Sequence, residues 1–368
     1  MLIFVTGGCF PRGGRGASRA LSAPAGSPLS ASPAGVGHLP LQSTVLKYQY
    51  YTLTEPNLLE ELRVSAQRFF THPAGVLASA IAATFLWGSA IPVVKKSYEH
   101  FGIASGEFGK QMLFAGYRFF LAGLLLWLVF YLWKGIALPK REELLPVIKV
   151  GLFQTFLQYV FFYIGLSLST GVQGSIIAGT TTFFQIIFAH FIYLDDRLSV
   201  RKILGMVIGF TGVVLANMNS GKLDFHFSTG EWLLIIAMIA SALGNILAKQ
   251  ASVKVAVGVL TSWQMMMGGA GLALIGISLE GVFPFHFDWI AGLLLLYLSF
   301  VSATGFFIWN NVMKYNPVGK VSMYLFLVPV FGVLLSTILL NETLQAMVLV
   351  SLCLVATGII IVNREKQV

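Results

Sequence analysis

The chain has 368 residues, of which 56% are hydrophobic and 11% are charged, and its formal net charge is +9. Soluble domains carry about 25% charged residues, so this composition excludes a water-soluble protein, and its apolar content excludes a disordered one. The two cysteines, Cys9 and Cys353, lie at opposite ends of the chain and predict neither a disulfide framework nor a metal site. The composition is that of a membrane protein.

Residues 1–70 form a leader of different composition, rich in Gly, Ala, Ser and Pro and without an acidic residue before Glu55. An acid-poor segment with Arg and Ser is typical of organelle transit peptides. A disordered tail and a start codon assigned too far upstream are the other interpretations. Asn57 and Glu60 can cap a short interfacial helix at the end of the leader.

Ten apolar runs of about 20 residues follow from Gly75 onward, which is the length a helix needs to cross ~30 Å of hydrocarbon. Because backbone groups in lipid must satisfy their own hydrogen bonds, each run is predicted to be a helix. The fold class is therefore an all-α membrane protein with ten transmembrane helices. The runs cover residues 75–94, 111–133, 145–166, 171–193, 200–219, 231–249, 256–279, 290–312, 319–340 and 345–363.

Lys and Arg residues are distributed unequally between the two sides of these ten helices. The side that holds the N-terminus has 15 of them near the helices, and the other side has 4. Such an excess marks the cytoplasmic side, so both termini are predicted to be cytoplasmic in a multi-pass plasma-membrane protein. The positive charge is thus explained by membrane topology, and a nucleic-acid partner is not expected.

An internal repeat appears when the sequence is shifted by 146 residues. The shift aligns Thr211-Gly212-Val213-Val214 with Thr357-Gly358-Ile359-Ile360 and divides the helices into halves at 75–219 and 229–364. Each half has five helices, and an odd number requires the second half to be inverted. The loop charges agree, because the loop after the fourth helix has three basic residues and its counterpart after the ninth has none.

Polar residues inside apolar helices are the candidates for a binding site. Arg118 is the only charged residue well inside a predicted span, and it either attracts an anionic substrate or extends to the outer headgroups. The amides and hydroxyls either line an uncharged cavity at the repeat interface or only join helices through hydrogen bonds. The candidate substrate-binding residues are Trp87, Ser89, Arg118, Gln154, Gln158, Thr181, Asn245, Gln264 and Asn310. Gln185, Ser302 and Thr304 belong to the same polar set.

Glycines and prolines within the apolar runs predict close contacts between helices and interruptions of helices. Gly205, Gly209 and Gly212 form a stripe that predicts close helix packing, within the chain or in a dimer, so a monomer and a homodimer both remain open. Pro92 and Pro329 can interrupt the first and ninth helices and free backbone groups toward a cavity.

Several chemistries find no support in the sequence. The interior of every predicted span lacks Asp and Glu, so a carboxylate proton relay has no evident residue. There is no phosphate-binding loop, zinc-protease motif or nucleophile elbow. The chain is therefore not predicted to be an enzyme, and no cofactor or metal is expected.

This arrangement resembles the EamA-type permeases of the drug/metabolite transporter superfamily. The resemblance rests on short motifs in order along the chain: Trp87-Gly88-Ser89, Arg118-Phe119, Gly212, Pro329, Glu342, Leu344 and Gly358. It implies secondary transport of a small metabolite, often export, through a central cavity with alternating access, with the lipid bilayer as the other partner. Two alternatives remain, a sugar-phosphate or nucleotide-sugar exchanger of the same superfamily and a membrane scaffold that transports nothing.

Overall fold

The computed structural model describes residues 64–104, 106–135, 138–169, 171–216, 228–340 and 346–364. All regular elements within these ranges are helices, which confirms the all-helical class for the described part of the chain. The predictions for the leader up to residue 63, including the Asn57 cap, lie outside the described residues, as do Glu342 and Leu344.

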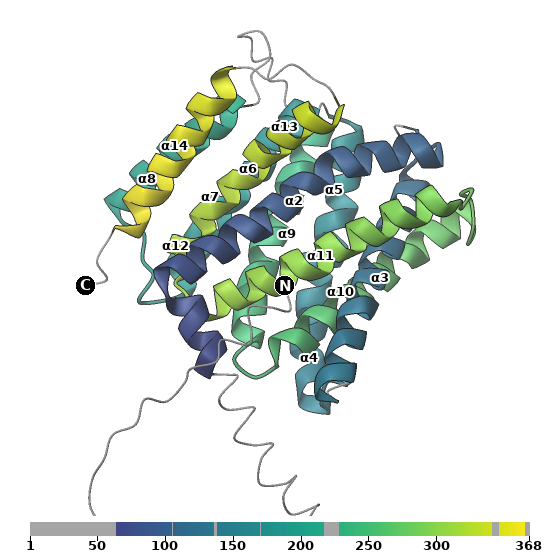
Figure 1. The fold of residues 1–368 in the computed structure, drawn as a ribbon, viewed down its shortest axis with the longest axis horizontal. Coiled ribbons are helices and arrows are strands. Elements are labelled where there is room, and N and C mark those ends of the chain that lie inside the picture. The colour runs from purple at the N-terminus through teal and green to yellow at the C-terminus, as the bar shows by residue number, and fades with distance from the viewer. Residues whose placement is uncertain are drawn as a thin grey trace, which may run out of the picture. The chain divides into compact units, whose positions relative to one another are not determined.

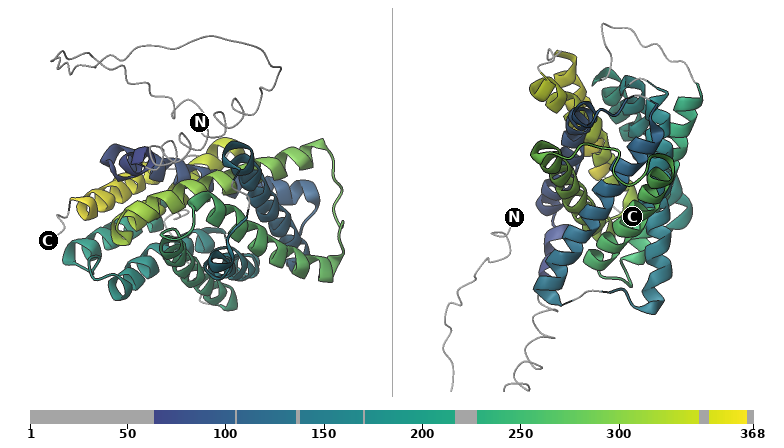
Figure 2. Two further views of the ribbon diagram at one scale, coloured as in Figure 1. Left: turned by 90° about the horizontal axis from the view of Figure 1, so that it is seen from below. Right: turned by 90° about the vertical axis from the view of Figure 1, so that its right-hand side faces the viewer.

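The helices follow one another in the order expected from the apolar runs (Figures 1 and 2). A short helical segment at 64–71 precedes them. In chain order they are α2 (Pro73–Phe101), α3 (Phe108–Lys134), α4 (Arg141–Val150), the π-helix η2 (Gly151–Leu157), α5 (Gln158–Ser167), α6 (Gly171–Gly179), α7 (Thr181–Ile192), α8 (Val200–Ala216), α9 (Thr229–Ala251), α10 (Val257–Glu280), α11 (Trp289–Tyr315), α12 (Val318–Val321), the 3₁₀-helix η3 (Ser322–Phe326), α13 (Leu327–Leu340) and α14 (Ala346–Asn363).

Seven helices among the described residues are long and apolar enough to cross a membrane, judged by length and composition. They are Pro73–Phe101, Phe108–Trp133, Arg141–Ser167, Thr229–Ala251, Val257–Glu280, Trp289–Tyr315 and Val318–Leu335. The other three predicted spans, 171–193, 200–219 and 345–363, fall on shorter described helices, α6 with α7, α8 and α14. The described helices thus support a multi-pass membrane protein.

Three of the expected spans are not continuous α-helices. The third becomes a π-helix at Gly151, and the fourth has a turn at Thr180 between α6 and α7. In the ninth, α12 ends at Val321 and a 3₁₀-helix separates it from α13, which begins at Leu327. This interruption lies just before Pro329, which has no N–H and whose ring clashes with the carbonyl four residues earlier. The expected interruption at Pro92 is wrong, since α2 continues through it to Phe101; packed neighbouring helices allow transmembrane helices to contain proline.

Glycines allow two pairs of helices to approach closely, α3 with α10 and α8 with α14 (Figure 1). A methyl group at Gly276 of α10 would come within 2.5 Å of Leu113 Cβ, and one at Gly358 of α14 within 2.6 Å of the Gly205 carbonyl oxygen. The predicted glycine stripe of α8 therefore packs against α14 of the same chain.

The contact between α3 and α10 gives a first prediction. Gly276→Ala is expected to destabilise the protein by about 1–3 kcal/mol, because the methyl group overpacks a backbone contact. The control is Gly292→Ala on α11, where an added methyl meets nothing within 4 Å; it should be neutral or stabilising by up to about 1 kcal/mol. The thermal midpoint of the purified protein in detergent measures both, and equal midpoints would contradict the close approach.

Candidate functional site

Four buried amide side chains from four helical segments meet inside the bundle. The Nε2 atom of Gln154 on η2 donates to Asn245 Oδ1 on α9 at 2.7 Å and to Asn310 Oδ1 on α11 at 3.3 Å. Asn245 in turn donates to Gln185 Oε1 on α7 at 2.9 Å. All four side chains are buried, so the bonds among them are shielded from solvent. We call Gln154, Gln185, Asn245 and Asn310 the amide cluster.

Hydroxyl groups extend the amide cluster in two directions. Asn310 Nδ2 donates to Thr261 Oγ1 on α10 at 2.9 Å, and Gln185 Nε2 donates to Ser322 Oγ on η3 at 3.0 Å. Beside the cluster, Thr155 Oγ1 donates to Gln264 Oε1 at 2.7 Å. The candidates from sequence did not include Thr261 and Ser322, which lie close to the ends of their helices, where polar residues are ordinary. Gln185 is visible in the sequence, one turn after Thr181.

The interruptions of the helices occur where these polar groups lie. The π-helix carries Gln154, the turn at Thr180 comes just before Gln185, and the 3₁₀-helix carries Ser322. π-Helical turns are frequent at functional sites. At membrane depth, irregular backbone is tolerated where it is buried in protein or lines a cavity. The amide cluster is therefore located at the least regular part of the helical bundle.

Five buried polar atoms near these residues have no hydrogen-bond partner among the described residues. Two are acceptors, Gln154 Oε1 and Gln158 Oε1, and three are donors, Gln264 Nε2 and the indole nitrogens of Trp87 and Trp309. A buried polar group without a partner costs about 1–3 kcal/mol. Water or a solute with complementary groups would remove that cost.

Arg118 is buried in the protein, with 4% of its surface exposed, so its side chain does not extend to the headgroups. Its Nε atom donates to Ser302 Oγ on α11 at 2.9 Å, and its guanidinium carbon lies over the ring of Phe119, 5.1 Å from the ring centroid. It makes no ion pair with any Asp or Glu that the structure describes. The charge of Arg118 is thus contacted by neutral groups.

Helix α11 contacts two of the remaining candidates, Ser89 and Trp87. Ser89 Oγ is 2.8 Å from the Tyr297 hydroxyl, and the ring centroid of Trp87 is 5.7 Å from that of Trp309. Thr181 is different, because its hydroxyl hydrogen-bonds to the Met238 sulfur at 2.9 Å and makes no direct bond to the amide cluster.

The structure thus brings the sequence candidates together unevenly. Gln154 is hydrogen-bonded directly to Asn245 and Asn310. Gln264 accepts a hydrogen bond from Thr155, the residue that follows Gln154 in the chain. Trp87, Ser89 and Arg118 each contact α11 without bonding to one another. Gln158 has no side-chain partner for its oxygen.

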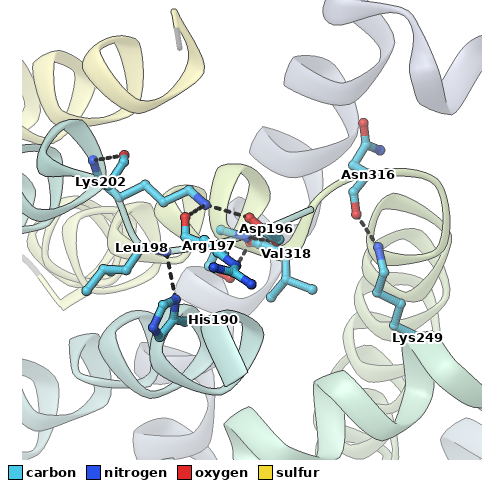
Figure 3. Close-up of polar contacts among 11 residues, drawn as sticks. His190, Asp196, Arg197, Leu198, Lys202, Lys249, Asn316 and Val318 are labelled. Atoms are coloured by element: carbon cyan, nitrogen blue, oxygen red, sulfur yellow. Dashed lines mark hydrogen bonds and ion pairs between the residues drawn. The ribbon is translucent and has the colours of Figure 1, made fainter. Parts of the chain in front are cut away.

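A second polar group, which we call the polar clamp, joins helix ends on one side of the bundle: Asp196, Lys202, Lys249 and Asn316 (Figure 3). Asp196 Oδ1 accepts from Lys202 Nζ at 2.7 Å, and its Oδ2 accepts from the Gly319 backbone N–H at 2.7 Å. The Lys249 ammonium donates to the carbonyl oxygen of Asn316. The clamp connects the loop after α7 to α12 and the end of α9 to the end of α11.

The opposite side of the bundle has a simpler contact between helix ends. His100 Nε2 at the end of α2 is 2.8 Å from Asp288 Oδ1, which also accepts from the Ala291 backbone N–H at the start of α11. The hydrogen bond from the Ala291 N–H lowers the pKa of Asp288, and the contact with His100 lowers it further. Asp288 is therefore an ionised cap at the N-terminus of α11.

Comparison with known proteins gives matches along almost the whole described chain. Residues 74–218 and 228–364 each match the EamA-like transporter family. The uncharacterized transporter YvbV of Bacillus subtilis is 27% identical over 77% of this chain and 89% of its own length. A WAT1-related chloroplastic protein of Arabidopsis thaliana is 26% identical over 77% of this chain and 68% of its own length.

Two further similarities concern a named pump and a solved structure. A probable amino-acid metabolite efflux pump of Salmonella typhimurium is 27% identical over 77% of this chain and 92% of its own length. One solved crystal structure has a TM-score of 0.64 with 16% identity, covering 79% of this chain and 96% of the other. At that identity the likeness concerns the fold alone.

Proposed function

Because this chain belongs to the EamA-like transporter family, we propose that it is a secondary transporter that moves a small metabolite by alternating access. Its substrate crosses the membrane through a central cavity between two inverted halves, 75–219 and 229–364. The observation that carries the proposal is the amide cluster, because Gln154 and Gln185 come from the first half while Asn245 and Asn310 come from the second. Transporter sites typically lie at such an interface.

The pairing of helices supports the inverted repeat. In the ten-helix numbering, α3 and α10 are the second helices of their halves, and α8 and α14 are the fifth; each pairs with its own counterpart. The first helix, α2, packs against the eighth, α11, and the sixth, α9, packs against the third, α4 to α5. Exchanging the two halves leaves the α3–α10 and α8–α14 contacts unchanged and converts the other two into each other. A two-fold axis between the halves requires this.

The cavity lining follows from the buried polar groups. The proposed substrate-binding residues are those predicted from the sequence: Trp87, Ser89, Arg118, Gln154, Gln158, Thr181, Asn245, Gln264 and Asn310. The unpartnered oxygens of Gln154 and Gln158 are available to N–H or O–H groups of a solute. The name of the Salmonella typhimurium relative favours a polar metabolite of amino-acid type.

Alternating access assigns a role to the polar clamp. The Asp196–Lys202 pair and the Lys249–Asn316 contact hold the helix ends together on one side of the bundle. These contacts close that side, and their separation opens it. Because Lys and Arg number 15 on the N-terminal side of the helices and 4 on the other, this side faces the cytoplasm of a plasma-membrane protein.

Counterflow in proteoliposomes tests the proposed function. Vesicles that contain the full chain and are preloaded with one amino acid, nucleoside or sugar phosphate are mixed with the same solute in labelled form. At least one solute is expected to accumulate transiently, while protein-free vesicles accumulate none. A scaffold would exchange no solute in the panel, and that result would contradict the proposal.

A further inference from the structure

The charge of Arg118 lacks a counter-charge. Its side chain is 4% exposed, and the groups that contact its guanidinium, the Ser302 hydroxyl and the Phe119 ring, are neutral. An ionised group buried without an opposite charge is strongly unfavourable, and in most interiors it is paired. Within the described spans no carboxylate pairs with it. The site therefore has an excess of one positive charge.

Two buried hydrogen-bond donors without a partner lie at the face of α11 that also contacts Arg118. The indole N–H groups of Trp87 and Trp309 are buried and have no acceptor among the described residues. The nitrogen of Trp87 lies against Gly305, where a methyl group would come within 2.7 Å of it. Gly305 is three residues after Ser302, the partner of Arg118, so it lies one turn along the same face of α11. An indole N–H can only donate, so these groups require an acceptor.

Aromatic rings connect the two parts of this site. The ring centroid of Tyr159 is 4.2 Å from that of Phe119, Phe119 is 6.4 Å from Phe306, and Phe306 is 5.2 Å from Trp87. The ring of Tyr163 is 5.9 Å from that of Tyr159, and the guanidinium carbon of Arg118 is 5.1 Å from the centroid of the Phe119 ring. A row of rings thus extends beside the guanidinium to the indole N–H. Such a wall favours a flat or apolar body over a heavily hydroxylated one.

We propose that Arg118 and the indole N–H of Trp87 bind the carboxylate of a singly charged substrate whose apolar body lies along the row of aromatic rings. Ser302 positions the guanidinium, because its oxygen accepts from Arg118 Nε and its hydroxyl proton is donated to the Leu298 carbonyl. This inference rests on the proposed function and specifies the substrate class of the same cavity. A carboxylate supplies the missing charge and accepts from a guanidinium in good geometry. A phosphate monoester, with close to two negative charges, would leave one charge unpaired, because Arg118 is the only cation deep in a predicted span.

Matched acids and amides test the charge requirement. The purified full-length protein is heated in detergent with benzoate or benzamide, and with propionate or propionamide, at equal concentrations. At least one acid should raise the thermal midpoint, because a ligand that binds only the folded state stabilises it. Its amide, which has the same shape but no charge, should not. Glycerol phosphate should be less effective than the acid.

Four variants separate the proposal from general effects. Arg118→Gln should lower the affinity for the acid by about 10- to 100-fold, as expected when hydrogen bonds to a charged group are lost, and Arg118→Lys should recover part of it. Trp87→Phe keeps a ring but removes the N–H, so it should also weaken the acid response. Lys110→Gln removes the same charge eight residues earlier on α3 and should leave the response unchanged.

Four results would overturn the proposal: no acid stabilises the wild type, amides stabilise it as much as acids, glycerol phosphate is the better ligand, or Arg118→Gln responds like the wild type. Transport separates this failure from that of the proposed function. Counterflow of a neutral solute that is equal in the wild type and in Arg118→Gln would keep the transporter and remove the carboxylate site. Acid binding that depends on Arg118, without counterflow of any solute, would keep the carboxylate site and remove the transporter.

Discussion

Asp196→Ala is expected to lower the free energy of unfolding by about 3–5 kcal/mol, which is the usual cost of removing one partner of a buried ion pair. Asp196 and Lys202 are 4% and 5% exposed. Without Asp196, the Lys202 ammonium would therefore keep its charge in an environment with little water and no opposite charge. The Gly319 N–H at the start of α12 would lose its acceptor as well. The thermal midpoint of the purified protein in detergent measures the loss.

The neighbouring Asp195 is a matched control, because it is exposed and makes no ion pair that the structure describes. Asp195→Ala should change stability by no more than about 0.5 kcal/mol. The double variant Asp196→Ala with Lys202→Met should recover much of the loss, because it leaves no uncompensated charge. If the Asp195 and Asp196 variants melt at the same temperature, the buried pair does not hold the polar clamp together.

Gln154→Leu is expected to reduce counterflow of the transported solute by about 10- to 100-fold. The substitution keeps the approximate size of the side chain but removes both donated bonds, to Asn245 and Asn310, and the free Oε1 acceptor. Each buried group left without a partner costs about 1–3 kcal/mol. Initial rates of counterflow, normalised to the amount of protein inserted in the vesicles, measure the effect.

Gln67→Leu is the control for that variant, because it makes the same change at an exposed position before α2. Its rate should equal that of the wild type. The amide cluster would have no role in transport if Gln154→Leu kept the wild-type rate at normal protein levels. A loss of folded protein in Gln154→Leu, seen as aggregation in gel filtration, would mean that the cluster is structural only.

The helical class and the polar positions were predictable because both depend on local features. A run of about 20 apolar residues determines a helix in lipid, and a polar residue such as Gln154 or Asn310 stands out within it. The pairing of these residues was not predictable from one sequence. Gln154 and Asn310 are 156 positions apart, and Asn245 and Gln185 are 60 apart, so only the packing of the helices brings them together.

The helix interruptions and the environment of Arg118 also depended on packing. Pro92 was expected to interrupt a helix and does not, whereas the π-helix at Gly151–Leu157 contains no proline at all. For Arg118 the sequence left open whether the side chain reaches the headgroups. Its bond to Ser302, 184 positions later, answers that question through the tertiary fold.

Cysteine labelling of the two repeat-equivalent loops tests the inverted arrangement most directly. In a background where Cys9 and Cys353 are replaced by Ser, Arg197→Cys follows the fourth helix and Glu342→Cys follows the ninth. With a reagent that does not cross membranes, Glu342→Cys should be labelled in intact cells, and Arg197→Cys only after the cells are opened. Labelling of both positions from the same side would contradict the inverted repeat and the cavity between its halves.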